Sequence, residues 1–419
     1  MHQDAVYGVS IDTRRGADAL SLSLMLFMAM NSISMALMAI VGTDLKDQFS
    51  FSAGQIGFLT SIFMLMFAIG GVPMGLAAAR WGGRTLILGG GLFALGSILF
   101  AFSASYPWFL VARFLQGVGS STVIPVSNPL MAQAIGPRYH ARALGIFGTG
   151  HGLGIVAALL ILPSIQGAGG YRAVFLTVAG MAIAITLVAV AQKTVRAKVR
   201  RHEGEISFSA LMRGLGSVAL SRRLILVAVV NIGVMAIVVG VLAWTPSFLH
   251  DQRGTTLAVA AYLTAGIGVA AMIGNIAGAA AMARWGKPVV LFLGMAVMFV
   301  ATALVPVVPG SGLVIACVVV AGLMTMVVFP AIFGSVPDIV DRPEQVGSAT
   351  GFVNLTGLVG TMLAPWLFGV LLDAYGTASG ESGYLSGYML LALFPLLGTI
   401  SGLIYLTTRR KRGLRTAAT

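Results

Sequence analysis

Twelve apolar stretches of 19 to 28 residues, separated by short polar segments, constrain this chain more than any other feature. An α-helix rises 1.5 Å per residue, so each stretch is long enough to cross about 30 Å of hydrocarbon. A lone strand leaves its backbone unsatisfied in lipid, and the ~10-residue alternation of barrel strands is missing. We therefore predict membrane helices near 19–41, 55–79, 85–103, 107–134, 141–163, 171–191, 223–248, 257–283, 288–306, 311–337, 346–372 and 385–407.

The composition is that of a membrane protein. Hydrophobic residues make up 58% of the chain and charged residues 9%, whereas charged residues are roughly a quarter of a soluble domain. The single cysteine, Cys317, excludes an internal disulfide and gives no information on the redox compartment. The polar N-terminus is too long for a signal peptide, so the first apolar stretch is predicted to be retained.

The distribution of basic residues predicts the orientation, because Lys and Arg near helix ends resist translocation. Of the 26 Lys and Arg residues, only Lys46, Arg172 and Arg253 fall in loops after odd-numbered helices, and Arg113 lies inside a helix. The other 22 lie in the terminal segments and in loops after even-numbered helices. Both termini are therefore predicted to be cytoplasmic.

The net charge of +13 has the same origin. The basic clusters at 193–201 and 409–415 adjoin membrane ends and lack interleaved aromatic residues. Anionic lipid headgroups are therefore the expected partner, and nucleic acid is not.

The longest connection, residues 192–222, predicts the domain organisation. We expect an N-terminal six-helix bundle at 1–191, a cytoplasmic linker at 192–222, and a C-terminal six-helix bundle with a basic tail at 223–419. The linker is interpreted either as plain connection or as a short helix on the membrane surface. Its apolar face would consist of Phe208, Leu211, Met212, Leu215 and Val218.

An internal repeat relates the two halves. The sequence ARWG occurs at 79–82 and again at 283–286, each time at the end of the second helix of its half. Residues 58–82 match 262–286 at Leu59, Thr60, Ile69, Gly70, Ala77, Ala79, Arg80, Trp81 and Gly82. The fifth helices show a weaker match, in which Gly145 and Gly154 correspond to Gly351 and Gly360. Parallel halves of this kind are typical of transporters that alternate access to a site at the membrane midplane.

Across nearly its whole length, the chain resembles the major facilitator superfamily. The family pattern G-x-L-a-D-R-x-G-R-R is represented in GLAAARWGGR by Gly75, Arg80, Gly82 and Arg84, and in a degenerate second copy by Arg284, Gly286 and Lys287. Ala79 and Ala283 stand where the family has an acid. The resemblance implies a cytoplasmic latch between the halves, weakened by the missing acid, and the loops also serve as tight turns that hold the chain inside.

A second motif, VARFLQGVGSS, resembles the family pattern R-x-x-q-G-x-G. Arg113 and Gln116 are three residues apart and share one helix face. An arginine inside the membrane requires a partner or a water-filled cavity. No acid lies in a predicted helix centre, so Arg113 is a candidate site for an anionic cargo group. The alternative is a structural role, in which Arg113 binds backbone carbonyls and Gln116, or extends toward the outer surface.

The fifth helix contains GIFGTGHGLG, which is too irregular for a nucleotide-binding loop and is not preceded by a strand. Gly148 with Gly152, and Gly150 with Gly154, predict close contact with a neighbouring helix. Among them His151 is the helix-centre residue that most readily exchanges a proton near neutral pH. It is a candidate for proton coupling, and the alternative is a neutral, hydrogen-bonded core histidine.

Polar residues elsewhere in the helices give further candidates. In the resembled family, helices 1 and 7 line the cavity, so Asn31 and Asn231 are expected to bind substrate more than Asn275 and Asn354, although any of them could join helices instead. Trp244 is interpreted as a cavity wall or as an interfacial anchor, and so is Trp366.

The function expected from the sequence is secondary transport of a small organic or inorganic anion by alternating access, with the proton as the candidate coupling ion. The segment 343–376 resembles anion-carrying branches of the family, and efflux of amphipathic compounds is the alternative. The chain lacks the nucleophile–base pair or metal cluster of an enzyme, so we expect no catalysis, cofactor or metal. A passive channel and a receptor are disfavoured by the duplicated halves and by the short loops. A monomer in a bacterial inner membrane is expected from the resemblance.

Overall fold

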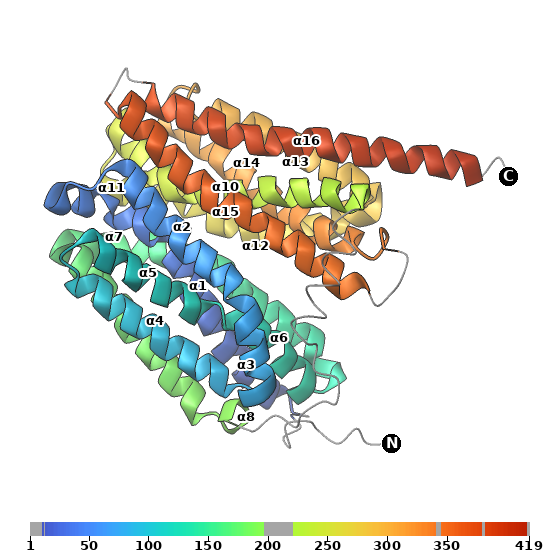
Figure 1. Cartoon of the computed structure of the whole chain (residues 1–419), viewed down its shortest axis with the longest axis horizontal. Helices are drawn as coiled ribbons and strands as arrows, with labels where there is room; N and C mark the ends of the chain where they lie inside the picture. The colour runs from blue at the N-terminus through green and yellow to red at the C-terminus, as the bar shows by residue number, and fades with distance from the viewer. Residues whose placement is uncertain (1–10, 12, 197–220, 341–344, 379–381, 417–419) are drawn as a thin grey trace. The chain divides into compact units, whose positions relative to one another are not determined.

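The computed structural model describes residues 11, 13–196, 221–340, 345–378 and 382–416, and these are helical almost throughout (Figure 1). The predicted surface helix at 208–218 lies outside the described residues. The chain divides into two compact units, one of Met1–Phe51 and Leu59–Glu205 (unit 1), the other of Ser52–Phe58 and Ile206–Thr419 (unit 2).

The helices of the first half run from blue to green in Figure 1. They are α1 (Arg14–Phe49), α2 (Ala53–Ile69), α3 (Gly71–Trp81), α4 (Arg84–Phe102), α5 (Tyr106–Ser120), α6 (Val123–Ala134), α7 (Pro137–Ala191) and α8 (Lys193–Arg196). The first turns of α2 are grouped with unit 2, where Asp373 accepts hydrogen bonds from the N–H groups of Ala53 and Gly54, both at 2.7 Å.

The helices of the second half run from yellow-green to red. They are α10 (Arg222–Arg253), α11 (Leu257–Thr264), α12 (Gly266–Trp285), α13 (Lys287–Leu304), α14 (Ser311–Ser335), α15 (Val346–Tyr375) and α16 (Gly383–Thr416).

Within the described residues, eleven helical segments are long and apolar enough to cross a membrane. One of them, α7, has 55 residues, or roughly 80 Å of helix, and includes both the fifth and the sixth predicted stretch. Its backbone leaves helical geometry at Gly169 and Gly170, where φ of Gly170 is 64°. Only glycine adopts this conformation at little cost, so α7 consists of two helices joined at a glycine pair.

Three other predicted stretches are interrupted helices. The second is divided into α2 and α3 at Gly70, the fourth into α5 and α6 after Ser120, and the eighth into α11 and α12 at Ala265. The first two interruptions are in contact, because a Cβ added to Gly70 would lie 2.5 Å from Ser121 Oγ. The interruptions therefore depend on packing between helices.

Glycines bring helix backbones together in each unit. A Cβ on Gly154 of α7 would lie 2.3 Å from the carbonyl oxygen of Ala29 in α1. A Cβ on Gly360 of α15 would lie 2.2 Å from the carbonyl oxygen of Ile232 in α10. The two glycines that the internal repeat relates thus make the same kind of contact, each with the first long helix of its half.

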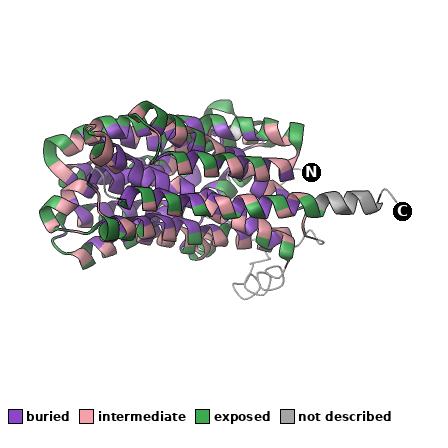
Figure 2. Ribbon diagram, turned by 90° about the horizontal axis from the view of Figure 1, so that it is seen from above, coloured by how far each residue is buried: buried purple, intermediate pink, exposed green. Residues whose placement is uncertain are grey.

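Exposed positions on the helices are often large and apolar. In α4, for example, Leu88 and Leu95 are each 54% exposed and Phe102 is 68% exposed. Many of the helices carry both buried and exposed positions (Figure 2). Apolar side chains exposed along long helices are expected where lipid is the solvent.

Candidate functional site

Arg113 lies in α5, is completely buried, and is held by four hydrogen bonds in unit 1. Its Nε donates to the Leu59 carbonyl of α2 at 3.0 Å. Its Nη1 group donates two hydrogen bonds, one to Ser34 Oγ of α1 at 3.0 Å and one to Gln116 Oε1 at 2.9 Å. The Nη2 group donates to the Ser34 carbonyl at 3.3 Å. A guanidinium has five N–H donors, so four of them are directed at neutral oxygens of the protein.

The network around Arg113 extends to a fourth helix. Gln116 Nε2 donates to Ser97 Oγ of α4 at 2.8 Å, and the Phe63 ring centroid lies 4.4 Å from the Arg113 Cζ. The predicted pairing of Arg113 with Gln116 is present, and so are contacts with backbone carbonyls. The network therefore joins α1, α2, α4 and α5 around one cation.

No carboxylate neutralises this cation within the described part of the chain. The ion pairs found there are Arg14–Asp18, Arg142–Asp18 and Lys287–Asp338. A buried charge that is solvated only by neutral oxygens attracts an anion, because charges interact strongly where water is excluded. Arg113 can therefore both support structure and supply positive potential.

Asn31 lies on α1 one turn before Ser34 and is completely buried. Neither its Oδ1 nor its Nδ2 has a hydrogen-bond partner among the described residues. A buried amide that is not hydrogen-bonded costs free energy, so its position calls for a physical explanation. Asn31 thus differs from Arg113 and Gln116, whose polar atoms bind one another.

His151 of α7 contacts α1 through a hydrogen bond of 2.9 Å between its Nδ1 and Ser32 Oγ. Ser32 Oγ is also 3.1 Å from the Met28 carbonyl and donates to it. With that hydrogen used, Ser32 accepts from His151, so this geometry favours the tautomer protonated at Nδ1. The contact places the histidine at the close α1–α7 crossing, next to Gly150 and Gly154.

The predicted residues in unit 2 join α10 to α15. Asn231 Nδ2 donates to the Val353 carbonyl at 2.7 Å. Trp244 is 3% exposed, donates through Nε1 to the Pro365 carbonyl at 3.0 Å, and stacks on Phe368 with centroids 5.4 Å apart. Trp244 therefore packs within the core of unit 2.

The remaining candidates lie apart from these contacts. Asn354 is exposed, and Trp366 is 36% exposed with its ring edge-on to Phe58 at 6.1 Å. The Asn275 side chain lies outside the described residues.

The two ARWG loops are tight turns. Gly82 and Gly286 have φ of 62° and 79°, the left-handed region that favours glycine. Arg80, Arg84 and Arg284 are exposed. The two loops are therefore turns at helix ends with exposed basic side chains, as predicted. Their basic residues contact different parts of the protein.

Each loop is fastened within its own unit. In unit 1, Arg84 Nε donates to the Arg196 carbonyl of α8 at 3.1 Å. In unit 2, Lys287 Nζ lies 2.5 Å from the Gly334 carbonyl and 3.1 Å from an Asp338 carboxylate oxygen. Lys287 thus pairs with an acid that lies three residues after the end of α14.

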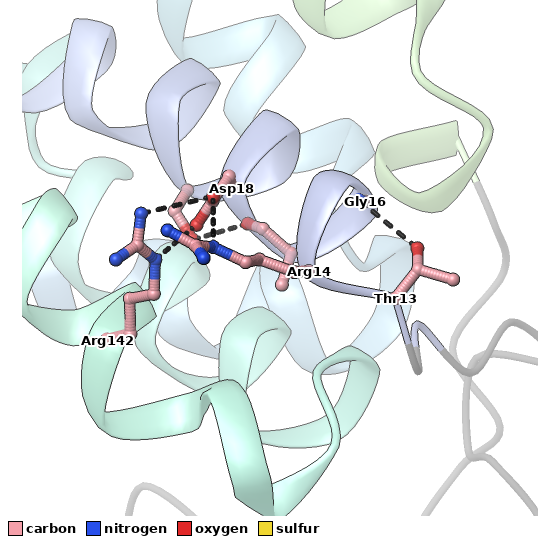
Figure 3. Close-up of polar contacts among 7 residues, drawn as sticks. Thr13, Arg14, Gly16, Asp18 and Arg142 are labelled. Atoms are coloured by element: carbon pink, nitrogen blue, oxygen red, sulfur yellow. Dashed lines mark hydrogen bonds and ion pairs between the residues drawn. The ribbon is translucent and has the colours of Figure 1, made fainter.

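Sequence reasoning missed an ion pair at the start of α1 (Figure 3). Asp18 accepts from Arg142 of α7 at 2.7 and 3.2 Å, and Arg14 lies 3.8 Å from the same carboxylate. Thr13 Oγ1 caps α1 by accepting from the Gly16 N–H. A threonine at this position is a recognisable signal for a helix cap. The ion pair has no such signal in the sequence, because Asp18 and Arg142 are 124 positions apart.

The fold and these buried polar networks define a polytopic α-helical membrane protein built from two units. The model of the Major Facilitator Superfamily matches residues 22–311 and 256–419. The chain therefore belongs to that superfamily, as its sequence motifs predict.

Named relatives support the family, one over nearly the full length and one over about half. The chain is 25% identical to the hexuronate transporter of Bacillus subtilis over 92% of this chain and 97% of the relative. It is 28% identical to a probable 4-methylmuconolactone transporter of Cupriavidus pinatubonensis, in a match that spans 54% of each protein. A crystal structure of a bacterial homologue of the human lysosomal transporter Spinster has the same fold, with a TM-score of 0.75 at 17% identity, covering 95% of this chain and 98% of that one.

Proposed function

We propose that this protein is a secondary transporter that moves a small organic anion across a bacterial cytoplasmic membrane by alternating access. The observation that carries the proposal is the buried cation Arg113, which pairs with no carboxylate of the described residues, in a chain of this superfamily. The named cargo of the relatives, hexuronate in one and 4-methylmuconolactone in the other, supports a small oxygenated substrate.

The proposed topology has twelve crossings with both termini in the cytoplasm. Eleven candidate spans support it, because α7 is too long for one crossing and bends at Gly169 and Gly170. Two six-helix bundles at 1–191 and 223–419, joined by the linker 192–222, fit this count. The bundles rock about a midplane site, and the protein acts as a monomer.

The proposed cargo site includes Arg113, Gln116, Asn31, Asn231 and Trp244. Within it, Arg113 supplies the positive potential that attracts the anion. On the cytoplasmic side, the two basic loops form the latch that the family resemblance implies. The residues of the latch are Arg80, Gly82, Arg84, Arg284 and Gly286.

The proposed coupling ion is the proton, carried by His151. Its Nδ1 donates to Ser32, so a proton added at Nε2 would leave this hydrogen bond in place while the ring gains a charge and a second donor, which supports a role as a proton carrier held at a fixed position. A pH jump applied to wild-type vesicles with substrate should move protons along with the substrate. Unchanged internal pH during substrate uptake would remove the proton from the proposal.

Uptake by proteoliposomes tests the function. We expect saturable uptake of a labelled hexuronate or a related carboxylate, accelerated when unlabelled substrate is loaded on the opposite side. Arg113→Gln should reduce uptake at least about tenfold, since it removes the cation and keeps a polar side chain. Arg113→Lys, which keeps the charge but loses the planar fork, should retain more activity than Arg113→Gln.

The stability of both variants is measured alongside, because Arg113 also joins four helices. A variant that stays folded and transports anions normally would contradict the role of Arg113. Uptake of lipophilic cations with no response to carboxylates would instead favour the efflux of amphipathic compounds.

A further inference from the structure

We propose that the Asn31 amide is the group that recognises a hydroxyl on the transported anion, which makes hydroxy acids the preferred substrate class. This inference rests on the proposed function and assigns the chemistry of one subsite. The predicted cargo residues differ in how far the protein itself satisfies their polar atoms. Each of the others has at least one polar group engaged by the protein, whereas both polar atoms of Asn31 lack a partner among the described residues.

Arg113 is committed mainly to the protein. Four of its N–H groups point at Leu59, Ser34 and Gln116, which leaves one Nη2 hydrogen for any other acceptor. It therefore attracts a carboxylate by its charge more than by a bidentate hydrogen-bonded pair. The direct contacts that distinguish one anion from another must come from a neighbouring group.

Asn31 is that neighbour. It is three residues before Ser34 on α1, so the two side chains share a helix face with Cβ atoms roughly 5–6 Å apart. Ser34 Oγ is itself 3.0 Å from the Arg113 guanidinium. An anion drawn toward Arg113 thus comes within one helical turn of the unpaired amide.

The chemistry of a primary amide defines its complement. Asn31 presents two N–H donors and one carbonyl acceptor. A hydroxyl accepts from Nδ2 and donates to Oδ1, and so satisfies both of the unpartnered atoms. A hydroxyl close to the carboxylate therefore fits the pair formed by Asn31 and Arg113, whereas a methylene in the same place leaves the amide unsatisfied.

The test compares matched acids with and without the hydroxyl. Inhibition of labelled hexuronate uptake is measured for malate against succinate and for lactate against propionate. In the wild type we expect each hydroxy acid to inhibit at about tenfold lower concentration than its partner, the scale of one hydrogen bond. Asn31→Leu should weaken uptake of the labelled hexuronate, which is itself a hydroxy acid, and should remove the difference in inhibition between each hydroxy acid and its partner. Asn354→Leu, at an exposed position of α15, is the matched control and should keep the preference.

Thermal unfolding in detergent gives an independent readout. Leucine has the branched shape and the number of side-chain heavy atoms of asparagine, is larger, and has no polar atom. Asn31→Leu removes two unsatisfied polar atoms, which offsets the cost of its extra volume, so it should unfold near the wild-type temperature, whereas Gln116→Leu, which breaks a hydrogen-bonded network, should unfold below it. A preference unchanged in Asn31→Leu, or a large loss of stability, would overturn the assignment. If wild-type vesicles take up no carboxylate at all, the proposed function fails instead, and the unfolding comparison still reports whether the amide has a structural partner.

Discussion

At the scale of single residues, the molecule depends on glycines that admit a neighbouring backbone. Gly154 and Gly360 are separated by half the chain, yet an added Cβ at either would lie within 2.3 Å of a carbonyl oxygen. Gly148, on the same helix as Gly154, has nothing within 4 Å of its position. The sequence predicted that Gly150 and Gly154 would pack closely, and they do. It could not distinguish them from Gly148, because spacing alone does not say which face meets α1.

Gly154→Ala should therefore destabilise the protein by about 1–3 kcal/mol, since the helices must separate to admit the methyl group. The matched control Gly148→Ala should be neutral or stabilising by about 0.5–1 kcal/mol, because alanine favours the helix and meets no neighbour. Unfolding in detergent, followed by tryptophan fluorescence, measures both. Equal effects of the two substitutions would show that α1 and α7 do not cross at Gly154.

At the scale of elements, the length of each apolar stretch predicted a membrane helix, because the thickness of the membrane fixes the length of helix that crosses it. The breaks within the second, fourth and eighth stretches were not predictable, since contacts such as that of Gly70 with Ser121 decide them. The candidate site around Arg113 was likewise predictable only in part. Arg113 and Gln116 were identified from their spacing, but the Leu59 and Ser34 carbonyls that bind Arg113 are backbone atoms and leave no mark on the sequence.

The ion pair between Asp18 and Arg142 fastens the start of α1 to the start of α7. Arg142→Asp places two acids together and should lower stability slightly, because solvent screens the charges of an exposed pair. The reversed pair, Asp18→Arg with Arg142→Asp, should recover part of that loss, although Arg14 then faces a like charge. A double-mutant cycle with no coupling energy would mean that the two helix ends are held by other contacts.

At the scale of the whole molecule, the proposed topology depends on α7 crossing the membrane twice. The single Cys317 makes a clean test available, because Cys317→Ala leaves a chain without thiols. In that background Ala168→Cys, an exposed position beside the glycine pair, should react with a membrane-impermeant maleimide added to intact cells.

Arg138→Cys, exposed at the start of α7, should react only after the membrane is permeabilised. Labelling of both positions from one side would mean that α7 does not reverse direction across the bilayer in the proposed way, and the count of twelve crossings would be wrong.

The order of the Arg113 contacts along the chain has a consequence for biogenesis. Ser34, Leu59 and Ser97 are all synthesised before Arg113, and Gln116 follows three residues later. When this arginine leaves the ribosome and enters the translocon, three of the four oxygens that accept its hydrogen bonds are already in the nascent chain. The charged residue thus reaches the bilayer when most of its partners have preceded it and the last is three residues behind, and none of these partners belongs to the second half.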